Sequence, residues 1–384
     1  NSYWACPLNK IIMALILTEE QKMLKDSARE FLEINSPLES FRTLRDNDYK
    51  SYDSDVWRGF VEMGWTALII PEKYGGLDFG YTGLGQIIEE TGRTLTKSPI
   101  ISSILLSSSA IILSDNDELK DKWLPELMNG KTLMSLALDE KSGFNPNSIN
   151  SNAEEIGKNY IINGKKKMVI NGNNSDFYIV IANLNKSISL FLVDSSSDGI
   201  NTQTDILMDT GSYSTVSFKN VKVPLKNKLN VNISGTSLLN ELLDIGTIGF
   251  SCEMLGSVQA AFEQTISYIK EREQFGKKIG SYQALQHRSA DLFCEIELCK
   301  SIVLRSLQSI DNGDKDLTNL AHLAKAKLGE VLKRTSNEAI QMHGGIGVTD
   351  DVDIGFYLKR ARVIQYLFGD TNYHLNAIAK IKGY

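Results

Sequence analysis

The chain has 384 residues and a formal net charge of −6, and 42% of its residues are hydrophobic and 23% are charged. At roughly 100 to 200 residues per domain, this length predicts about two or three domains with sizeable cores. Basic residues are not in excess, which argues against nucleic acid or an anionic membrane surface as a partner. We therefore expect small molecules or other proteins as partners.

We expect no export signal and no membrane span in this sequence. The KIIMALIL stretch lacks a signal-peptide cleavage pattern, and the longest apolar runs, such as residues 100–106, are far shorter than the roughly 20 residues that cross a bilayer. Met13 has the features of a native start, so residues 1–13 are interpreted as an extension or a tag remnant. The four cysteines show no C-x-x-C spacing, which favours a reducing, cytoplasmic compartment.

Residues 14–130 are predicted to form an N-terminal helical domain. Thr18 and Gln21 are spaced as a capping box, and apolar residues then recur at helical intervals. Pro71 and the glycines that follow it interrupt the helices. Helical spacing returns in TGLGQIIEETGRTL and in ISSILLSSSAIILS.

The spacing at which apolar residues recur changes twice after this region. Residues 131–232 contain short runs rich in β-formers, such as FYIVIANL and SISLFLVD, separated by NG, GNN and SSSDG turns. They predict a middle antiparallel β domain. Residues 233–384 return to long amphipathic patterns with short connections, which predict a helical bundle. The expected fold class is α+β, in the order helical, β, helical.

Two stretches in the C-terminal region carry residues suited to binding chemistry. In REREQFGKKIGSYQ, Arg272 stands at a predicted helix end, next to a glycine turn, with Phe275 and Gln283 close by. A guanidinium is a planar fork suited to phosphate, although a basic residue at a helix C-terminus more often complements the helix dipole.

The second stretch is QMHGGIGVTDD, which begins at Gln341. Its glycines, Gly344 and Gly345 among them, expose backbone N–H groups that can approach a diphosphate. About half of such runs are simply helix C-caps. The run does not follow a strand or open a helix, so it is not a Rossmann fingerprint. The four histidines show no metal-ligand spacing, and no metal site is predicted.

Taken together, R-x-Q-F-G followed by Y-Q, and then Q-x-x-G-G-x-G, resemble the acyl-CoA dehydrogenase family of flavoproteins. Further segments of the chain are similar to the same family: MGWTALIIPEKYGG and IEETGR to its N-terminal domain, and NGKKKMVING and FKNVKVP to its middle domain. The resemblance covers nearly the whole chain after Met13. It implies FAD as cofactor, an acyl-CoA substrate in fatty acid or lipid metabolism, and a tetramer built as a dimer of dimers.

The resemblance also implies which residues bind the cofactor. In the family, the β domain of one subunit holds the flavin ring, and the C-terminal bundle of its neighbour holds the pyrophosphate and adenine. Six residues of this chain match the half that the bundle contributes: Arg272, Phe275, Gln283, Gln341, Gly344 and Gly345.

The half that the β domain contributes departs from the family pattern. The family's T-E-P-G-x-G-S-D loop is represented by LDEKSGFNPNS, in which Asp139 takes the threonine place and only Glu140 is shared. The W-I-T run beside the flavin ring is replaced by Met168, Val169 and Ile170. An aliphatic Ile170 cannot supply the hydroxyl that hydrogen-bonds the ring edge.

The residue at the position of the catalytic base also differs from the family pattern. Desaturation of an acyl-CoA requires a carboxylate to remove the α-proton, and the family places this glutamate immediately before a glycine near the C-terminus. Phe368, which precedes Gly369, holds that place here. Some members carry the glutamate on the first helix of the bundle instead, where this chain has Gly246.

Three interpretations follow from these departures. The chain is similar to the F-G-D type, the small or non-catalytic subunit of heteromeric acyl-CoA dehydrogenases, in which a paralogue supplies the base. Alternatively it is a self-sufficient homo-oligomer with a relocated base, Asp370 first and Glu253 second, although Asp370 is also placed to cap the next helix. The third interpretation is a non-catalytic scaffold that binds acyl-CoA or a protein.

Overall fold

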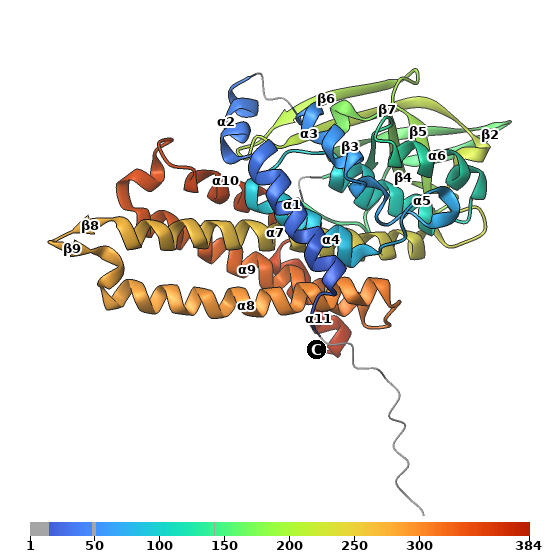
Figure 1. Cartoon of the computed structure of the whole chain (residues 1–384). Coiled ribbons are helices and arrows are strands. Elements are labelled where there is room, and N and C mark those ends of the chain that lie inside the picture. The colour runs from blue at the N-terminus through green and yellow to red at the C-terminus, as the bar shows by residue number, and fades with distance from the viewer. Residues whose placement is uncertain (1–14, 48–50, 142) are drawn as a thin grey trace, which may run out of the picture.

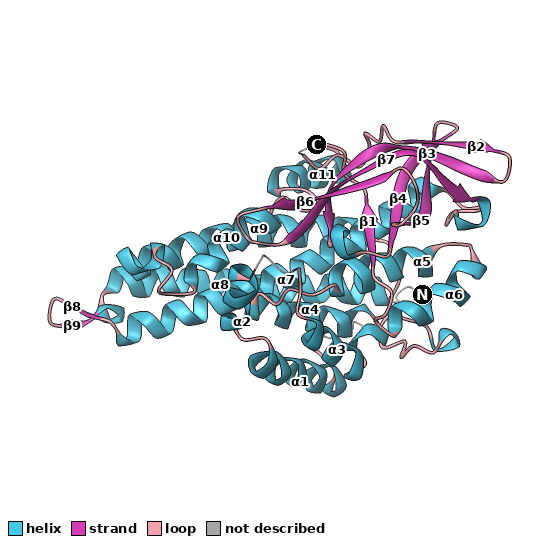
Figure 2. Cartoon of the chain, turned by 90° about the horizontal axis from the view of Figure 1, so that it is seen from above, coloured by secondary structure: helices cyan, strands magenta, loops and turns pink. Residues whose placement is uncertain are grey.

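The computed structural model of the chain describes residues 15–47, 51–141 and 143–384. The predicted extension at residues 1–13 lies outside these ranges. Figures 1 and 2 show a long helical bundle that carries a small hairpin at one end and packs against a sheet and further helices at the other. Within the described ranges, no helix is both long enough and apolar enough to cross a membrane.

The N-terminal part of the chain is helical, as predicted. The capping box at the start of its first helix is confirmed, since Gln21 N donates to Thr18 Oγ1 at 3.2 Å and Thr18 N donates to Gln21 Oε1 at 3.0 Å. The helices are α1 (Glu19–Asn35), α2 (Leu38–Asp46), α3 (Ser54–Glu62), α4 (Tyr81–Thr94), η3 (Ile100–Ser108), α5 (Ser109–Leu113) and α6 (Asp117–Met128).

One of these helices, η3, is a π-helix and not the regular helix that its spacing predicts. Two of its serine hydroxyls bond carbonyls five residues back. Ser107 Oγ donates to the Ser102 carbonyl at 2.7 Å, and Ser108 Oγ donates to the Ser103 carbonyl at 3.2 Å. These side-chain bonds support the wider turn, which is frequent at functional sites.

The middle of the chain forms a seven-stranded sheet with the order β1-β4-β2-β3-β7-β6, in which β5 also pairs with β4. The strands are β1 (Met134–Ala137), β2 (Asn152–Ile156), β3 (Asn159–Ile170), β4 (Phe177–Leu184), β5 (Ser187–Asp194), β6 (Ile200–Ile206) and β7 (Ser212–Pro224). Most pairs are antiparallel, but β4 runs parallel to both β1 and β2. The sheet is therefore mixed and not purely antiparallel, because a long connection lets the chain return to β4 in the direction of β1.

The C-terminal bundle consists of three long helices and two shorter ones. They are α7 (Gly235–Glu271), α8 (Gln283–Asp311), α9 (Leu317–His343), α10 (Ile354–Ile364) and α11 (Thr371–Lys382). A small hairpin joins α7 to α8, and its strands, β8 (Glu273–Gln274) and β9 (Lys277–Lys278), have two residues each. Helix α7 is buried almost without interruption from Leu242 to Ala261, which makes it the central helix of the molecule.

Helices α4 and α7 cross with their backbones in direct contact. A Cβ atom on Gly256 would lie 1.8 Å from the Glu89 carbonyl oxygen, and one on Gly92 would lie 2.1 Å from the Glu253 carbonyl oxygen. Ser257 Oγ also donates to the Gly92 carbonyl at 3.0 Å. The absence of side chains at these glycines therefore fixes how the N-terminal helices sit on the bundle.

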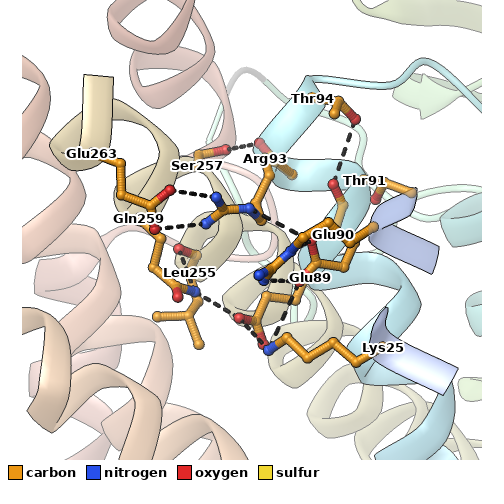
Figure 3. Close-up of polar contacts among 12 residues, drawn as sticks. Lys25, Glu89, Glu90, Thr91, Arg93, Thr94, Leu255, Ser257, Gln259 and Glu263 are labelled. Atoms are coloured by element: carbon orange, nitrogen blue, oxygen red, sulfur yellow. Dashed lines mark hydrogen bonds and ion pairs between the residues drawn. The ribbon is translucent and has the colours of Figure 1, made fainter. Parts of the chain in front are cut away.

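A buried ion network holds the same crossing (Figure 3). Glu89 and Glu90 on α4 are almost fully buried. Lys25 Nζ on α1 lies 2.7 Å from Glu89 Oε1, and Gln259 Nε2 on α7 donates to the same oxygen at 2.6 Å. Arg29 on α1 binds Glu90 through two nitrogens, at 2.9 and 3.0 Å. Each buried carboxylate thus has partners on neighbouring helices, as buried charge requires.

The glycine crossing gives a stability prediction. We expect Gly256→Ala to lower the free energy of unfolding by about 1–3 kcal/mol, because the added methyl group forces two helix backbones apart. Gly355 on α10 is the matched control, since the nearest atom to a Cβ there lies 3.9 Å away. Gly355→Ala should keep or raise stability, because alanine favours helix. Urea denaturation of the two variants compares them, and an unchanged midpoint for Gly256→Ala would contradict the account of the crossing.

Candidate functional site

The six residues predicted to bind a diphosphate lie at one end of the bundle. Arg272 is the C-cap of α7, Gln283 opens α8, Gln341 lies in the last turn of α9, and Gly344 is the C-cap of that helix. This end carries the β8–β9 hairpin and lies away from the chain's own sheet (Figure 2). The bundle therefore presents these residues to the outside of the molecule, where a neighbouring chain can reach them.

These residues are exposed and have few partners of their own. Within the part of the chain that the structure describes, Arg272 forms no ion pair, and the side-chain amides of Gln283 and Gln341 form no hydrogen bond. A Cβ atom on Gly344 or Gly345 would meet nothing within 4 Å. A guanidinium, two amides and an open glycine turn fit a phosphate-bearing group.

Phe275 stands at the tip of the hairpin with 93% of its surface exposed. Phe275 and Gly276 have φ angles of 52° and 78°, the left-handed values that a two-residue hairpin turn requires. A bulky residue seldom adopts such a value. An exposed aromatic ring held in this strained turn is expected where it packs against another molecule.

A small hydrophobic core holds the helices together at this end of the bundle. Ile269 on α7, Leu292 on α8 and Met342 on α9 pack together. The ring of Tyr268 stacks on that of His343, with centroids 4.3 Å apart, and its hydroxyl donates to the His343 carbonyl at 3.3 Å. The ends of three helices are thereby held in a fixed relation to one another.

The second region of interest is the turn between α10 and α11. Phe368 and Gly369 have φ angles of 57° and 102°, so a large side chain is again held in the left-handed region. Lys325 of α9 is 1% exposed, and its ammonium donates to the Gly369 carbonyl at 2.9 Å and to the Gln365 carbonyl at 3.2 Å. Burial lowers the pKa of Lys325 to about 7.

The ring of Phe368 fills the space where the family pattern places a carboxylate. It packs against Phe250 of α7, with centroids 5.0 Å apart, and lies stacked near Phe144 at 5.9 Å. A Cβ atom on Gly246 would lie 2.5 Å from Phe368 Cε1. Phe368 and Gly246, the two positions at which the resemblance predicts the family's glutamate, are thus neighbours in space, and one aromatic ring fills the space between them.

Phe144 belongs to the loop that the sequence analysis matches to the family's flavin-binding motif. Its ring meets Tyr373 of α11 edge-on at 5.1 Å, in addition to its stacking near Phe368. Glu140, the shared acid of this loop, lies 2.8 Å from Lys166 Nζ and accepts from Ser151 N at 2.8 Å. Although burial acts to raise it, the pKa of Glu140 is lowered to about 2 by these contacts. Phe144 and Glu140 of this loop therefore both contact other parts of their own chain.

Both acids that the sequence analysis named as candidates for a relocated base have hydrogen-bond partners within the chain. Asp370 caps α11, since its Oδ1 accepts from Tyr373 N at 2.8 Å. This is the capping role that was the alternative to catalysis. Glu253 of α7 accepts from Arg360 Nε at 2.7 Å. Both carboxylates are therefore engaged in structural contacts.

Two further carboxyl groups have pKa values that the sequence did not indicate. Burial raises the pKa of Asp139 to about 7 and that of Asp244, on α7, to about 6. Asp244 Oδ2 accepts from Thr318 Oγ1 at 2.6 Å. Neither residue type nor spacing signals such shifts, because desolvation depends on which segments the fold brings together.

The structure also brings together two histidines that are 52 residues apart. The Nδ1 atoms of His322 and His374 are 2.7 Å apart. Burial lowers the pKa of both rings, and that of His374 falls to about 3, so the pair is neutral under ordinary conditions. Among the described residues, no group of three or more possible metal ligands gathers.

Comparison with known proteins gives the same picture over the length of the chain. Three family models match: acyl-CoA dehydrogenase N-terminal domain over residues 18–131, middle domain over residues 136–221 and C-terminal domain over residues 234–382. The short/branched chain specific acyl-CoA dehydrogenase of Bos taurus is 28% identical, over 94% of this chain and 85% of its own length.

Solved structures agree in fold. Butyryl-CoA dehydrogenase from Megasphaera elsdenii is 25% identical, with a TM-score of 0.87, over 96% of this chain and 99% of its own. A chain of the ChsE4-ChsE5 complex from Mycobacterium tuberculosis is 22% identical, with a TM-score of 0.90, over 97% of this chain and 100% of its own. The second likeness concerns the fold alone.

The capping role of Asp370 predicts a split between two substitutions. Asp370→Ala should lower the free energy of unfolding by about 0.5–2 kcal/mol, because α11 loses its cap, whereas Asp370→Asn should lower it far less, since asparagine also caps. Asp198, an exposed aspartate whose side chain bonds no other described residue, is the control, and Asp198→Ala should be close to neutral. Equal stability of wild type and Asp370→Ala in urea denaturation would show that the cap contributes nothing.

Proposed function

Because the three matching regions show that the chain belongs to the acyl-CoA dehydrogenase family, we propose that it is the subunit of a heteromeric, FAD-dependent acyl-CoA dehydrogenase that lacks the catalytic base. A paralogous chain would supply the glutamate and the pocket for the flavin ring. This chain would supply the binding site for the flavin diphosphate. The assembly we propose is a dimer of dimers.

The observation that carries this proposal is the ring of Phe368 packed against Gly246. Desaturation of an acyl-CoA needs a carboxylate within reach of the α-carbon, and the bound flavin accepts the β-hydride. A phenyl ring cannot accept a proton. Phe144 stacks near the same ring from the side of the β domain, which supports the proposal that the chain's own site lacks the base.

The end of the bundle supports the other half of the proposal. Arg272 and Gln341 are exposed without side-chain partners among the described residues, and Phe275 projects from the hairpin. A chain that had lost all contact with the cofactor would have no use for this arrangement, which argues against the scaffold interpretation. The ChsE4-ChsE5 structure illustrates that the fold occurs in a complex named for two different chains.

A second candidate function is that of a self-sufficient homo-oligomer. The raised pKa of Asp244 favours it, because a general base works best with a pKa near the operating pH. Asp244 lies two residues before Gly246 on α7. In this case the isolated chain would bind FAD, and Asp244→Asn would abolish reduction of the flavin by acyl-CoA.

Expression alone and with a paralogue tests the proposal. The isolated chain should be colourless, and co-expression with a paralogous chain that carries a glutamate at either family position should give a yellow complex that reduces its flavin with acyl-CoA. A yellow, active isolated chain would overturn the proposal in favour of the homo-oligomer. A pair that forms a complex without flavin would favour the scaffold.

The assembled complex also tests Arg272. Arg272→Ala should weaken FAD retention by about tenfold to a hundredfold, because it removes a charged donor from the diphosphate. The matched control is Arg58→Ala, since Arg58 is an exposed arginine whose ion-pair partners, among the residues that the structure describes, are Asp55 and Glu62 of its own helix. The flavin absorbance per mole of complex, measured after gel filtration, compares the two. Equal flavin content in both variants would contradict the placement of Arg272.

A further inference from the structure

The turn between α9 and α10, residues 344–353, begins with the two glycines that are predicted to meet the diphosphate. Its own hydrogen bonds are local, since Thr349 N and Oγ1 donate to the Ile346 carbonyl at 3.0 and 2.7 Å. A Cβ atom on Gly344 or Gly345 would meet nothing within 4 Å. Because glycine permits a wide range of backbone angles, contacts from elsewhere in the chain are needed to keep the turn in one conformation.

Two arginines of α2 supply such contacts at the end of the turn that leads into α10. Arg45 binds the Asp350 carboxylate through two nitrogens, each at 2.8 Å. Arg42 donates to Asp350 Oδ2 at 3.1 Å and to Asp353 Oδ1 at 2.7 Å. Two parallel bonds from one guanidinium fix the orientation of a carboxylate as well as its distance. We call these four residues the arginine clamp.

An aromatic layer beneath the arginine clamp keeps the two guanidinium groups in place. The Cζ atoms of Arg42 and Arg45 lie over the Phe356 ring of α10, at 4.6 and 5.2 Å from its centroid. Phe41 of α2 packs on the same ring, with centroids 5.0 Å apart. The two arginine side chains are only 17% and 18% exposed. Both guanidinium groups are therefore held between a ring and carboxylates, where salt screens them less than it screens fully exposed ion pairs.

We propose that Arg42 and Arg45 are positioning residues for the diphosphate half of the flavin site. They act through the two carboxylates of the arginine clamp, which set the path of the backbone that follows the glycines. The inference rests on the proposed function, in which these glycines meet the diphosphate of a flavin held by a neighbouring chain. The N-terminal domain thereby contributes to a site whose proposed ligands lie in the C-terminal bundle.

The effect expected of the arginine clamp is on binding more than on global stability. Ion pairs near a surface contribute little to the free energy of unfolding. The apolar core that joins α2 to α10, which contains Phe41 and Phe356, does not depend on their charges. A turn that is not held in one conformation has to be ordered when the diphosphate binds, and this ordering weakens binding. Loss of the clamp should therefore weaken FAD retention by about threefold to tenfold.

Two neighbouring aspartates of the turn provide the test and its matched control. Asp350→Asn removes the charge that both arginines bind, whereas Asp351→Asn makes the same change one residue later. Asp351 is exposed, and its side chain forms no ion pair or hydrogen bond among the residues that the structure describes. Hydrogen exchange over residues 344–353, measured on the full chain without cofactor, should become about threefold to tenfold faster in Asp350→Asn and stay unchanged in Asp351→Asn.

FAD retention by the complex with the paralogue is the second measurement. Flavin absorbance per mole of complex after gel filtration should fall in Asp350→Asn and in Arg45→Gln, whereas Asp351→Asn should match the wild type. The double variant Asp350→Asn/Arg45→Gln should lose little more flavin than either single variant, because both substitutions break the same pair. The melting temperature without cofactor checks folding, and it should be similar in all these variants.

Three results would each overturn the positioning role. They are wild-type hydrogen exchange in Asp350→Asn, equal effects of Asp350→Asn and Asp351→Asn, and faster exchange of the turn with unchanged FAD retention. Arg272→Ala separates this inference from the proposed function. If Arg272→Ala loses flavin and Asp350→Asn does not, the positioning role alone is wrong. If neither variant loses flavin, the placement of the diphosphate is wrong and the positioning role is rejected with it.

Discussion

The contact between the ring of Phe368 and Gly246 is the constraint on which the rest of this account depends. Helix α7 and the turn after α10, which are far apart in the sequence, meet at that point. A side chain at Gly246 would collide with the ring, and the ring holds a strained backbone conformation because it packs so closely. The family resemblance predicts a carboxylate at one position or the other in related chains, whereas this chain has apolar packing across both.

This packing divides the molecule into two ends with different properties. Around Phe368 the rings of Phe144 and Phe250 pack against the chain itself, Glu140 pairs with Lys166, and Asp370 caps α11. At the hairpin end of the bundle, polar and aromatic side chains are exposed without partners among the described residues. Such asymmetry suits a chain that completes a binding site on another subunit and has none of its own.

The order of helical and β regions could be predicted from sequence because it depends on local periodicity, and the capping box at Thr18 depends on neighbouring residues. That Phe368 and Gly246 stand where the family carries its glutamate is also inferred from sequence position, and it stays a prediction. The contacts that close the site could not be predicted, since Phe144 meets Phe368 only through the fold. The same holds for the parallel pairing of β1 with β4 and for the π-helical turn, which depend on segments far apart in the chain or on side-chain hydrogen bonds.

The most direct test of the central claim is the flavin stoichiometry of the complex between this chain and its paralogue. If this chain contributes only the diphosphate half of a site, the purified complex should contain about one FAD for each pair of unlike chains. About one FAD for every chain would mean that the β domain of this protein also holds a flavin, and it would contradict the proposal that this chain contributes only the diphosphate half.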